Sequence, residues 1–148
     1  MKILVINGVN LNMLGIREPD LYGKQDYKSL VKFIKICAKN LNVKCKIKQF
    51  NEEGKIVTSI QKARTKFDAI VINAGAYTHT SVAILDALKA VALPVAEVHL
   101  TDIATREEFR KFSYISLYAD VLIKGEGFNG YKKALEFLKD KFNKSACE

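Results

Sequence analysis

The sequence is poor in tryptophan, proline and cysteine, and the low cysteine count bears on disulfide and metal sites. It contains no tryptophan, two prolines and three cysteines in 148 residues. Cys37, Cys45 and Cys147 are odd in number and lack C-x-x-C or cysteine–histidine ligand spacing, which argues against a disulfide framework and a structural zinc site. Reduced thiols of this kind are typical of the cytoplasm. We therefore expect a cytoplasmic protein that binds no metal.

Long apolar stretches are also missing. A membrane-spanning helix needs about 18 or more consecutive apolar residues, and no run in this chain approaches that length. The run from Ile3 to Ile6 is closed by Asn7 and Gly8, too early for the core of a signal peptide. A content of 49% hydrophobic and 27% charged residues is ordinary for a globular chain. The length predicts a single domain, residues 1–148, and the lack of long apolar runs leads us to expect no membrane partner.

The formal charge of +8 raises the question of a nucleic-acid partner. The lysines recur at helical spacing between Lys28 and Lys39, and they alternate with apolar residues between Lys44 and Lys48. Aromatic residues do not interleave with them as they do in nucleic-acid-binding surfaces. We interpret these lysines as solvated faces and expect no nucleic-acid partner. The four arginines are more informative, because three of them fall in loops that carry other polar candidates.

Five short apolar runs predict β-strands, and helical patterns separate most of them. The clearest helical pattern begins after Asp26, a good N-cap residue. The predicted strands are Lys2 to Asn7, Val43 to Phe50, Asp68 to Asn73, Val95 to Leu100, and Ala119 to Lys124. The predicted helices are Tyr27 to Leu41, Lys55 to Lys66, Thr80 to Val91, a short one at Thr105 to Phe112, and a last one after Asn129.

Strands that alternate with helices predict an α/β fold with a parallel sheet covered on both faces. We expect a flavodoxin-like, doubly wound, five-stranded sheet in the order 2-1-3-4-5. The nearly all-apolar first and third strands suit the centre of the sheet, and the lysine-rich second strand suits an edge. In such folds the ligand binds outside the carboxyl ends of the strands, next to the switch between the first and third strands.

Several side chains follow the predicted strands at this carboxyl edge. The first strand leads through Asn10 into a long segment with Arg17 and Tyr22, and a nearby guanidinium favours the phenolate form of a tyrosine. The fourth strand carries Glu97 and His99, which point to the same face because they are two residues apart. A carboxylate that holds one imidazole nitrogen makes a histidine a credible general acid. The alternative is that Glu97 only provides a hydrogen-bond partner for a buried histidine that has no catalytic role.

Competing motifs receive less support from the sequence. Gly125 to Gly130 matches G-x-G-x-x-G, but it follows the last strand, and Glu126 would repel a pyrophosphate, so we interpret it as a turn. A receiver-like domain needs a phosphoacceptor aspartate where Asn73 stands. A nucleotide- or flavin-binding module with the same fold needs a phosphate-cradling loop after the first strand. Receiver-like or nucleotide- or flavin-binding modules of the flavodoxin fold remain the alternative class.

The motifs taken together resemble the type II 3-dehydroquinate dehydratases, from about Ile3 to Leu138. Several multi-residue motifs occur in the family's order, which makes the resemblance specific. They are Ile6-Asn7-Gly8 with Asn10-Leu11-Asn12, Leu14-Gly15, Arg17-Glu18-Pro19, Tyr22-Gly23, Asn51 with Glu53-Gly54, Ile72-Asn73, Gly75 to Ile84 with Asp86-Ala87-Leu88, Glu97-Val98-His99-Leu100, Arg106 to Arg110, and Ser113-Tyr114.

The resemblance implies an anti elimination of water from 3-dehydroquinate, through an enolate and without metal, Schiff base or other cofactor. It implies that Tyr22, activated by Arg17, is the base, that Asn10 positions a water at the enolate oxygen, and that His99, held by Glu97, protonates the leaving hydroxyl. It further implies a dodecamer of four trimers and a supporting role for Arg106. The substrate-binding residues it implies are Asn73, His79, Arg110, Leu100, Thr101 and, from a neighbouring subunit, Asp86.

The chain departs from the family pattern at identifiable positions. Val9 and Ala74 replace usual prolines, and Asp102 stands where asparagine is usual, beside the expected carboxylate site. Ala104 and Thr105 replace the usual histidine and alanine before Arg106, and the segment from Leu117 to Glu126 also differs. Asp102 is expected to weaken substrate binding.

Overall fold

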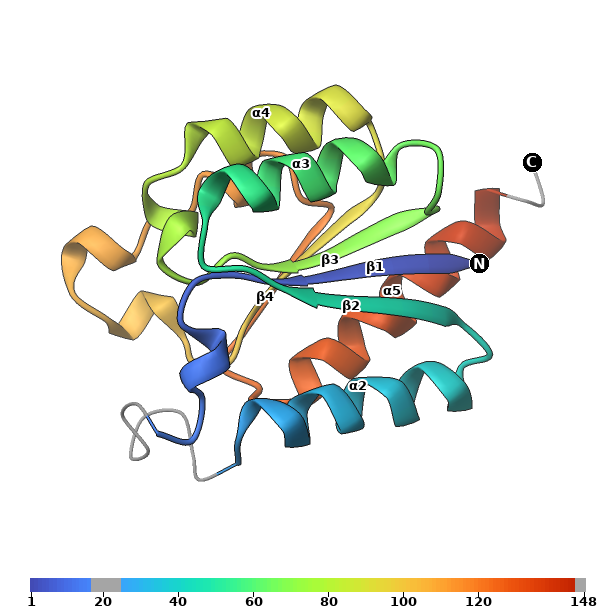
Figure 1. Ribbon diagram of the computed structural model, residues 1–148, viewed down its shortest axis with the longest axis horizontal. Helices are drawn as coiled ribbons and strands as arrows, with labels where there is room; N and C mark the ends of the chain where they lie inside the picture. Colours follow the sequence, from blue (N-terminus) through green and yellow to red (C-terminus); the bar gives the residue numbers. More distant parts are fainter. Residues whose placement is uncertain (17–24, 146–148) are drawn as a thin grey trace.

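A five-stranded sheet lies between two pairs of helices in the computed structural model of the chain (Figure 1), which describes residues 1–16 and 25–145. All neighbouring strands are parallel, and their order is β2-β1-β3-β4-β5. The predicted flavodoxin-like order is therefore confirmed. The strands are β1 (Lys2–Asn7), β2 (Lys44–Gln49), β3 (Ala69–Asn73), β4 (Val95–His99) and β5 (Val121–Lys124).

Helices α3 (Glu53–Ala63) and α4 (Val82–Val91) cover one face of the sheet, and α2 (Tyr27–Asn40) and α5 (Asn129–Ser145) cover the other (Figure 1). Each pair closes a separate hydrophobic core against the sheet. On one side the core includes Ile60 of α3 and Leu88 of α4, and on the other it includes Ile34 of α2 and Leu135 of α5. The sheet is held from both faces, which fixes the ends of its strands.

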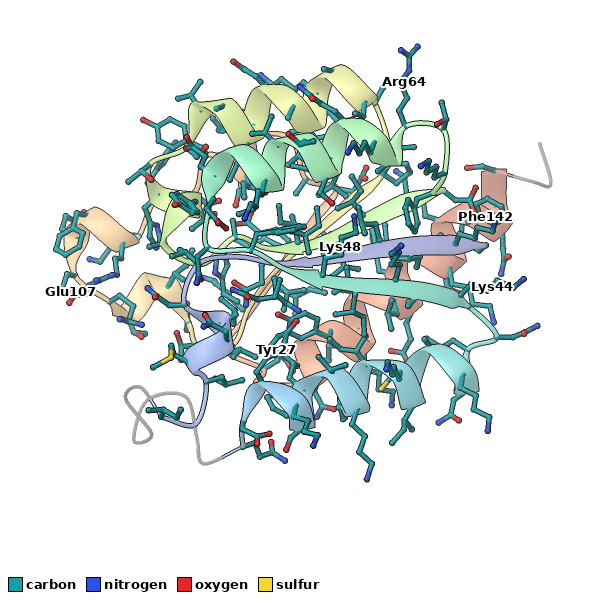
Figure 2. All side chains as sticks on the ribbon, in the orientation of Figure 1. Tyr27, Lys44, Lys48, Arg64, Glu107 and Phe142 are labelled. Atoms are coloured by element: carbon teal, nitrogen blue, oxygen red, sulfur yellow. The ribbon has the colours of Figure 1, made fainter. Side chains whose placement is uncertain are left out.

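The burial of each strand follows its composition. Strands β3 and β4 are buried along their whole length, and β1 is buried except at Lys2. Strand β2 instead alternates lysines with less polar residues, and Lys44 and Lys48 lie along this edge of the sheet (Figure 2). Charged side chains on an edge strand discourage pairing with another chain.

The helix boundaries differ from the predicted ones where short turns intervene. The Asp26 carboxylate accepts a 2.8 Å bond from the Ser29 N–H and caps α2, as predicted. Helix α4 begins at Val82 rather than Thr80, because the Ser81 hydroxyl caps it by accepting a 3.0 Å bond from the Ile84 N–H. Residues Gly75–His79 form a separate 3-10 helix, η2, just before it.

The short helix predicted from Thr105 to Phe112 is wrong. This segment holds parts of two 3-10 helices, η3 (Ile103–Thr105) and η4 (Glu108–Arg110), separated by an extended Arg106. The Asp102 carboxylate caps η3 at the Ala104 N–H, which fixes that turn locally. A third turn, η5 (Ile115–Leu117), follows before β5. Turns η3 and η4, with η1 (Leu11–Met13) after β1, lie at the carboxyl edge of the sheet (Figure 1), whereas η5 contacts α4.

The G-x-G-x-x-G segment is a turn between β5 and α5, as interpreted from the sequence, and both Gly125 and Gly127 have positive φ. Within residues 1–16 and 25–145, no helix is long and apolar enough to cross a membrane.

Candidate active site

A pocket opens at the carboxyl edge, where the segments after β1, β3 and β4 meet. Only glycine fits at position 8 between β1 and η1, because a Cβ there would lie 2.2 Å from the Ala74 carbonyl oxygen. This close approach brings the segments after β1 and β3 together at the switch point. The pocket is lined by Val9, Asn10, Leu11, Met13, Leu14, Asn73, Gly75, Ala76, His79, His99, Leu100, Thr101, Ile103, Arg106 and Arg110.

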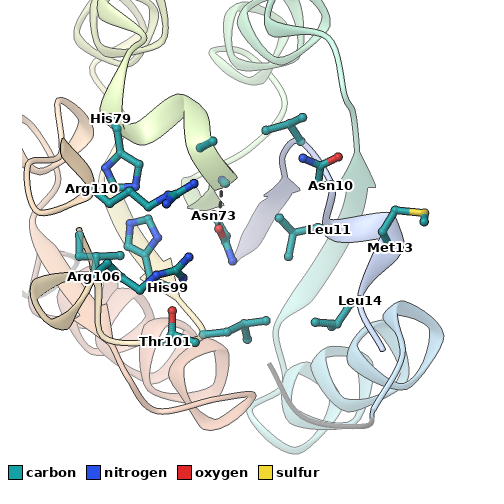
Figure 3. Close-up of a pocket in the computed structure, with 15 residues that line it drawn as sticks. Asn10, Leu11, Met13, Leu14, Asn73, His79, His99, Thr101, Arg106 and Arg110 are labelled. Atoms are coloured by element: carbon teal, nitrogen blue, oxygen red, sulfur yellow. Dashed lines mark hydrogen bonds between the residues drawn. The ribbon is translucent and has the colours of Figure 1, made fainter. Parts of the chain in front are cut away.

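The lining is divided into a polar side and an apolar side. Figure 3 shows His79, His99, Arg106 and Arg110 together on one side, opposite Leu11, Met13 and Leu14, with Asn73 between them. The imidazole rings of His79 and His99 are stacked, with centroids 6.5 Å apart and planes 17° apart. A small polar molecule with an anionic group matches this combination of cationic donors and an apolar wall.

Glu97 and His99 form the buried pair that their spacing on β4 predicts. The His99 Nε2 lies 2.6 Å from the Glu97 Oε1, and the Glu97 side chain is fully buried. Because a carboxylate only accepts hydrogen bonds, this contact makes Nε2 the donor and leaves Nδ1 for a ligand. The arrangement is that of an imidazole oriented for proton transfer.

Three hydroxyls complete the surroundings of Glu97. Ser113 Oγ and Thr78 Oγ1 each lie 2.6 Å from Oε1, and Ser116 Oγ lies 2.6 Å from Oε2. Burial raises the pKa of this carboxyl, but the hydrogen bond and charge of His99, together with hydrogen bonds from both serines, outweigh burial and hold the pKa of Glu97 below its usual value. Glu97 is therefore an ionised carboxylate at neutral pH.

Glu107 connects the two arginines of the pocket. Its carboxylate oxygens lie 2.7 Å from the Arg110 Nη1 and 3.7 Å from the Arg106 Nε. The hydrogen bond from Arg110 lowers the pKa of Glu107, which therefore stays ionised. Glu107 lies at the outer edge of the molecule (Figure 2). The guanidinium groups are thus oriented from outside the pocket.

Asn73 is oriented from below by a buried polar network. The Tyr131 hydroxyl accepts a 3.1 Å bond from the Asn73 Nδ2 and donates a 2.6 Å bond to the Asn7 Oδ1. The Gly75 N–H donates a 3.1 Å bond to the Asn73 Oδ1. Burial raises the pKa of Tyr131 far above its ordinary value, so its phenol keeps its proton. Asn73 is held with its amide fixed and one N–H available for hydrogen bonding toward the pocket.

Asn10 is held in a left-handed conformation, with φ at +66°, by the segment after β2. Its backbone N–H donates a 3.0 Å bond to the Asn51 Oδ1, and Gln49 Nε2 donates a 3.0 Å bond to the same oxygen. Gln49 also donates a 3.1 Å bond to the Gly8 carbonyl oxygen. The position of Asn10 at the pocket therefore depends on residues that the sequence did not single out for a role.

The structure brings together eight of the predicted site residues in one pocket and places Glu97 behind them. Asp86 lies on α4 with an exposed side chain and is not among the residues that line the pocket. Arg17 and Tyr22 lie outside the described residues. Among the residues that are described, no three His, Cys, Asp or Glu side chains gather as metal ligands would.

The sequence did not assign roles to the groups that hold the predicted ones in place. Thr78, Ser113 and Ser116 reach Glu97 from two separate segments, and Glu107 was noted only as part of a motif. Residues in such loops follow no regular period, so the direction of their side chains cannot be predicted from the sequence. The one available signal was the need of a buried carboxylate for donors.

The chain is similar to known proteins both in sequence and in fold. The profile of the family Dehydroquinase class II matches residues 1–139. The 3-dehydroquinate dehydratase of Clostridium acetobutylicum is 46% identical over 144 residues, which cover 97% of this chain and all of that protein. The protein of the same name from Fusobacterium nucleatum is 50% identical over 147 residues, covering 97% of this chain and all of that protein.

Solved structures give the same result. The type II dehydroquinase from Butyrivibrio crossotus superposes with a TM-score of 0.92 at 46% identity, and the match covers 93% of this chain and 97% of that one. A 3-dehydroquinate dehydratase-like protein from Bifidobacterium longum is more distant, with a TM-score of 0.67 at 27% identity, covering 97% of this chain and 98% of that one. The similarity extends over nearly the whole chain in both sequence and structure.

Proposed function

The chain belongs to the class II dehydroquinase family, and from this we propose how its pocket carries out the family's reaction. It is a hydro-lyase that removes water from 3-dehydroquinate, a step of the shikimate pathway. The alternative of a receiver-like or flavin-binding module has no support from these matches. The observation that carries the function at the level of residues is the buried Glu97–His99 pair facing a pocket with two arginines.

The leaving hydroxyl needs a proton, and His99 is the group we assign to give it. The 2.6 Å contact with Glu97 uses Nε2, so the proton leaves from Nδ1 to the hydroxyl oxygen as the carbon–oxygen bond breaks. The negative charge of Glu97 stabilises the imidazolium before transfer. Arg110, Asn73 and His79, with the Leu100 and Thr101 backbone, hold the substrate's carboxylate and hydroxyls, and their shared position on the pocket wall supports this assignment.

The proton next to the ketone is removed by Tyr22 in the proposed mechanism. Arg17 favours the phenolate by its charge, and Arg106 supports it from the pocket wall. The ketone oxygen then carries the negative charge of the enolate, which is stabilised by a water that Asn10 positions. The left-handed conformation of Asn10, fixed by Asn51, supports a defined place for that water. The hydroxyl group, protonated by His99, then leaves as water, which completes the elimination without a metal or Schiff base.

Purified protein mixed with 3-dehydroquinate is expected to raise the absorbance of the enone band of 3-dehydroshikimate. The rise should be unaffected by EDTA, because the proposed steps use only side chains. Borohydride added with substrate should leave the mass of the protein unchanged, whereas a Schiff-base mechanism would trap a covalent adduct. Absence of the enone band under all conditions would contradict the function, and loss of the band with EDTA would contradict the metal-free mechanism.

Asp102 is expected to weaken substrate binding only partly, because it is paired. Its Oδ1 lies 3.0 Å from the Lys124 Nζ, and this hydrogen bond lowers the pKa of Asp102. The variant Asp102→Asn keeps an oxygen for the Ala104 N–H and removes one negative charge beside Thr101. We expect its KM to fall by about fivefold, since the substrate's carboxylate is then no longer repelled by a neighbouring negative charge.

The matched variant Lys124→Gln is expected to raise KM, and the double variant should return it close to the parent value. Initial rates at low ionic strength measure these changes best, because salt screens exposed charges. An increase of KM in Asp102→Asn would show that Asp102 assists binding instead.

A homo-oligomer, a dodecamer of four trimers, is the assembly we propose, with Asp86 acting in a neighbouring subunit's pocket. The exposure of Asp86, away from the lining of its own pocket, supports this placement. Sedimentation velocity should give about twelve times the chain mass. Coexpressed Asp86→Ala and His99→Gln chains should form mixed oligomers with more activity than either variant alone. Absence of such complementation would place Asp86 in its own subunit's function.

A cytoplasmic location is also part of the proposal. Cys37 and Cys45 are free thiols, as expected in a reducing compartment. Cell fractionation with an antibody against the protein tests this placement.

A further inference from the structure

The hydroxyls around Glu97 come from separate segments that converge on one carboxylate. Thr78 belongs to η2. Ser116 belongs to η5, and Ser113 lies two residues before η5. The Tyr114 N–H donates a 2.8 Å bond to the Thr78 carbonyl oxygen, which ties these segments together. We propose that Thr78, Ser113 and Ser116 are positioning residues that keep Glu97 an acceptor-only carboxylate and thereby fix His99 with Nε2 protonated and Nδ1 facing the substrate.

The contact distances determine where the hydroxyl hydrogens can point. Thr78 Oγ1 and Ser113 Oγ lie 2.7 Å apart, and each lies 2.6 Å from the Glu97 Oε1. Each hydroxyl has one hydrogen, so if either donates to the other, the second still donates to Oε1. The Ser116 N–H donates a 3.1 Å bond to Ser113 Oγ, which directs the Ser113 hydrogen away from that side. The carboxylate therefore receives donors on both oxygens.

The electrostatic surroundings explain why neutral donors are suited to this position. Ile72 on β3 and Leu122 on β5 are the register partners of Glu97 in the neighbouring strands. Among the described residues, the charged and titratable groups that line the pocket with His99 are His79, Arg106 and Arg110, and Lys124 is the register partner of His99 on β5. A cation bound directly to Glu97 would compete with the imidazolium, whereas hydroxyls offset the burial of the carboxylate and leave its charge to hold His99.

The functional test rests on the proposed function and compares variants that lose or keep a hydroxyl. Ser116→Ala and Thr78→Val remove one, and Ser116→Thr and Thr78→Ser keep it. Because the donors favour ionised Glu97, their loss lets Glu97 take up a proton at higher pH. The acid limb of the kcat profile should therefore move up by about one pH unit, so that kcat falls about tenfold at a pH on that limb, changes little at neutral pH, and KM stays within about twofold.

The second test needs no substrate, so its failure is separate from failure of the proposed function. The chain has two histidines, so imidazole nitrogen NMR resolves His99 once His79→Gln assigns the signals. Neutral His99 should be a single tautomer with the proton on Nε2 in the parent, and a mixture in Ser113→Ala/Ser116→Ala. Retained tautomer and acid limb in that folded double variant would overturn the inference, as would equal damage from Thr78→Ser and Thr78→Val. If the parent protein were inactive on 3-dehydroquinate but the His99 tautomer still changed in the double variant, the inference would be supported and the proposed function overturned.

Discussion

Replacing His99 with glutamine is expected to lower kcat by about 10²- to 10⁴-fold, the usual contribution of a general acid. Glutamine can still donate hydrogen bonds from its amide, but it has no proton to transfer at neutral pH. Hydroxide would then have to leave unprotonated, which is the slow reaction that the Glu97–His99 pair avoids. Steady-state rates from the enone absorbance measure this loss, and the melting temperature checks that the buried β4 segment is intact.

His79→Gln is the matched control, because both imidazoles line the same pocket and stack on each other. The His79 Nδ1 lies 2.8 Å from the Phe112 carbonyl oxygen, and its assigned role is substrate binding. This variant should mainly raise KM, whereas His99→Gln should mainly lower kcat. If the two variants behaved alike, the assignment of His99 as the acid would be lost.

Much of the fold was predictable because β-strand geometry converts sequence spacing directly into direction. The nearly all-apolar β3 and the lysine-alternating β2 differ in composition, and this difference placed one inside the sheet and the other at its edge. The same rule predicted the contact of Glu97 with His99, since residues two apart on a strand share a face. Residues that end adjacent parallel strands are brought to one edge by the topology alone.

Contacts between loops were beyond such rules. Tyr131 orients Asn7 from 124 positions away in the chain, and nothing in its local pattern distinguishes it from an ordinary core aromatic. The segment from Ile103 to Leu117 contains three short 3-10 helices, of which Asp102 caps the first, so the single short helix predicted from Thr105 to Phe112 was wrong. The proton-transfer pair was therefore predictable, whereas the hydroxyls and Glu107 that hold the site were not.

Tyr22→Phe is expected to lower turnover by about 10³-fold or more while leaving the fold and substrate binding intact. The change removes only the phenolic oxygen, which is the base in the proposed mechanism. Substrate binding measured by calorimetry should persist, since the groups assigned to the substrate's carboxylate and hydroxyls are unchanged. Tyr118→Phe is a suitable control, because the Tyr118 hydroxyl donates to the Leu93 carbonyl oxygen and Tyr118 is not part of the pocket lining.

The pH dependence separates a base from a mere binding group. Tyrosine has an ordinary pKa of about 10, so without a neighbouring guanidinium its phenolate is scarce at neutral pH. Arg17→Gln should therefore lose most turnover at neutral pH and regain part of it as the pH rises, because hydroxide then generates the phenolate that Arg17 otherwise favours. Tyr22→Phe should show no such recovery. Retained activity in Tyr22→Phe, or an equal alkaline recovery in both variants, would show that another group removes the proton.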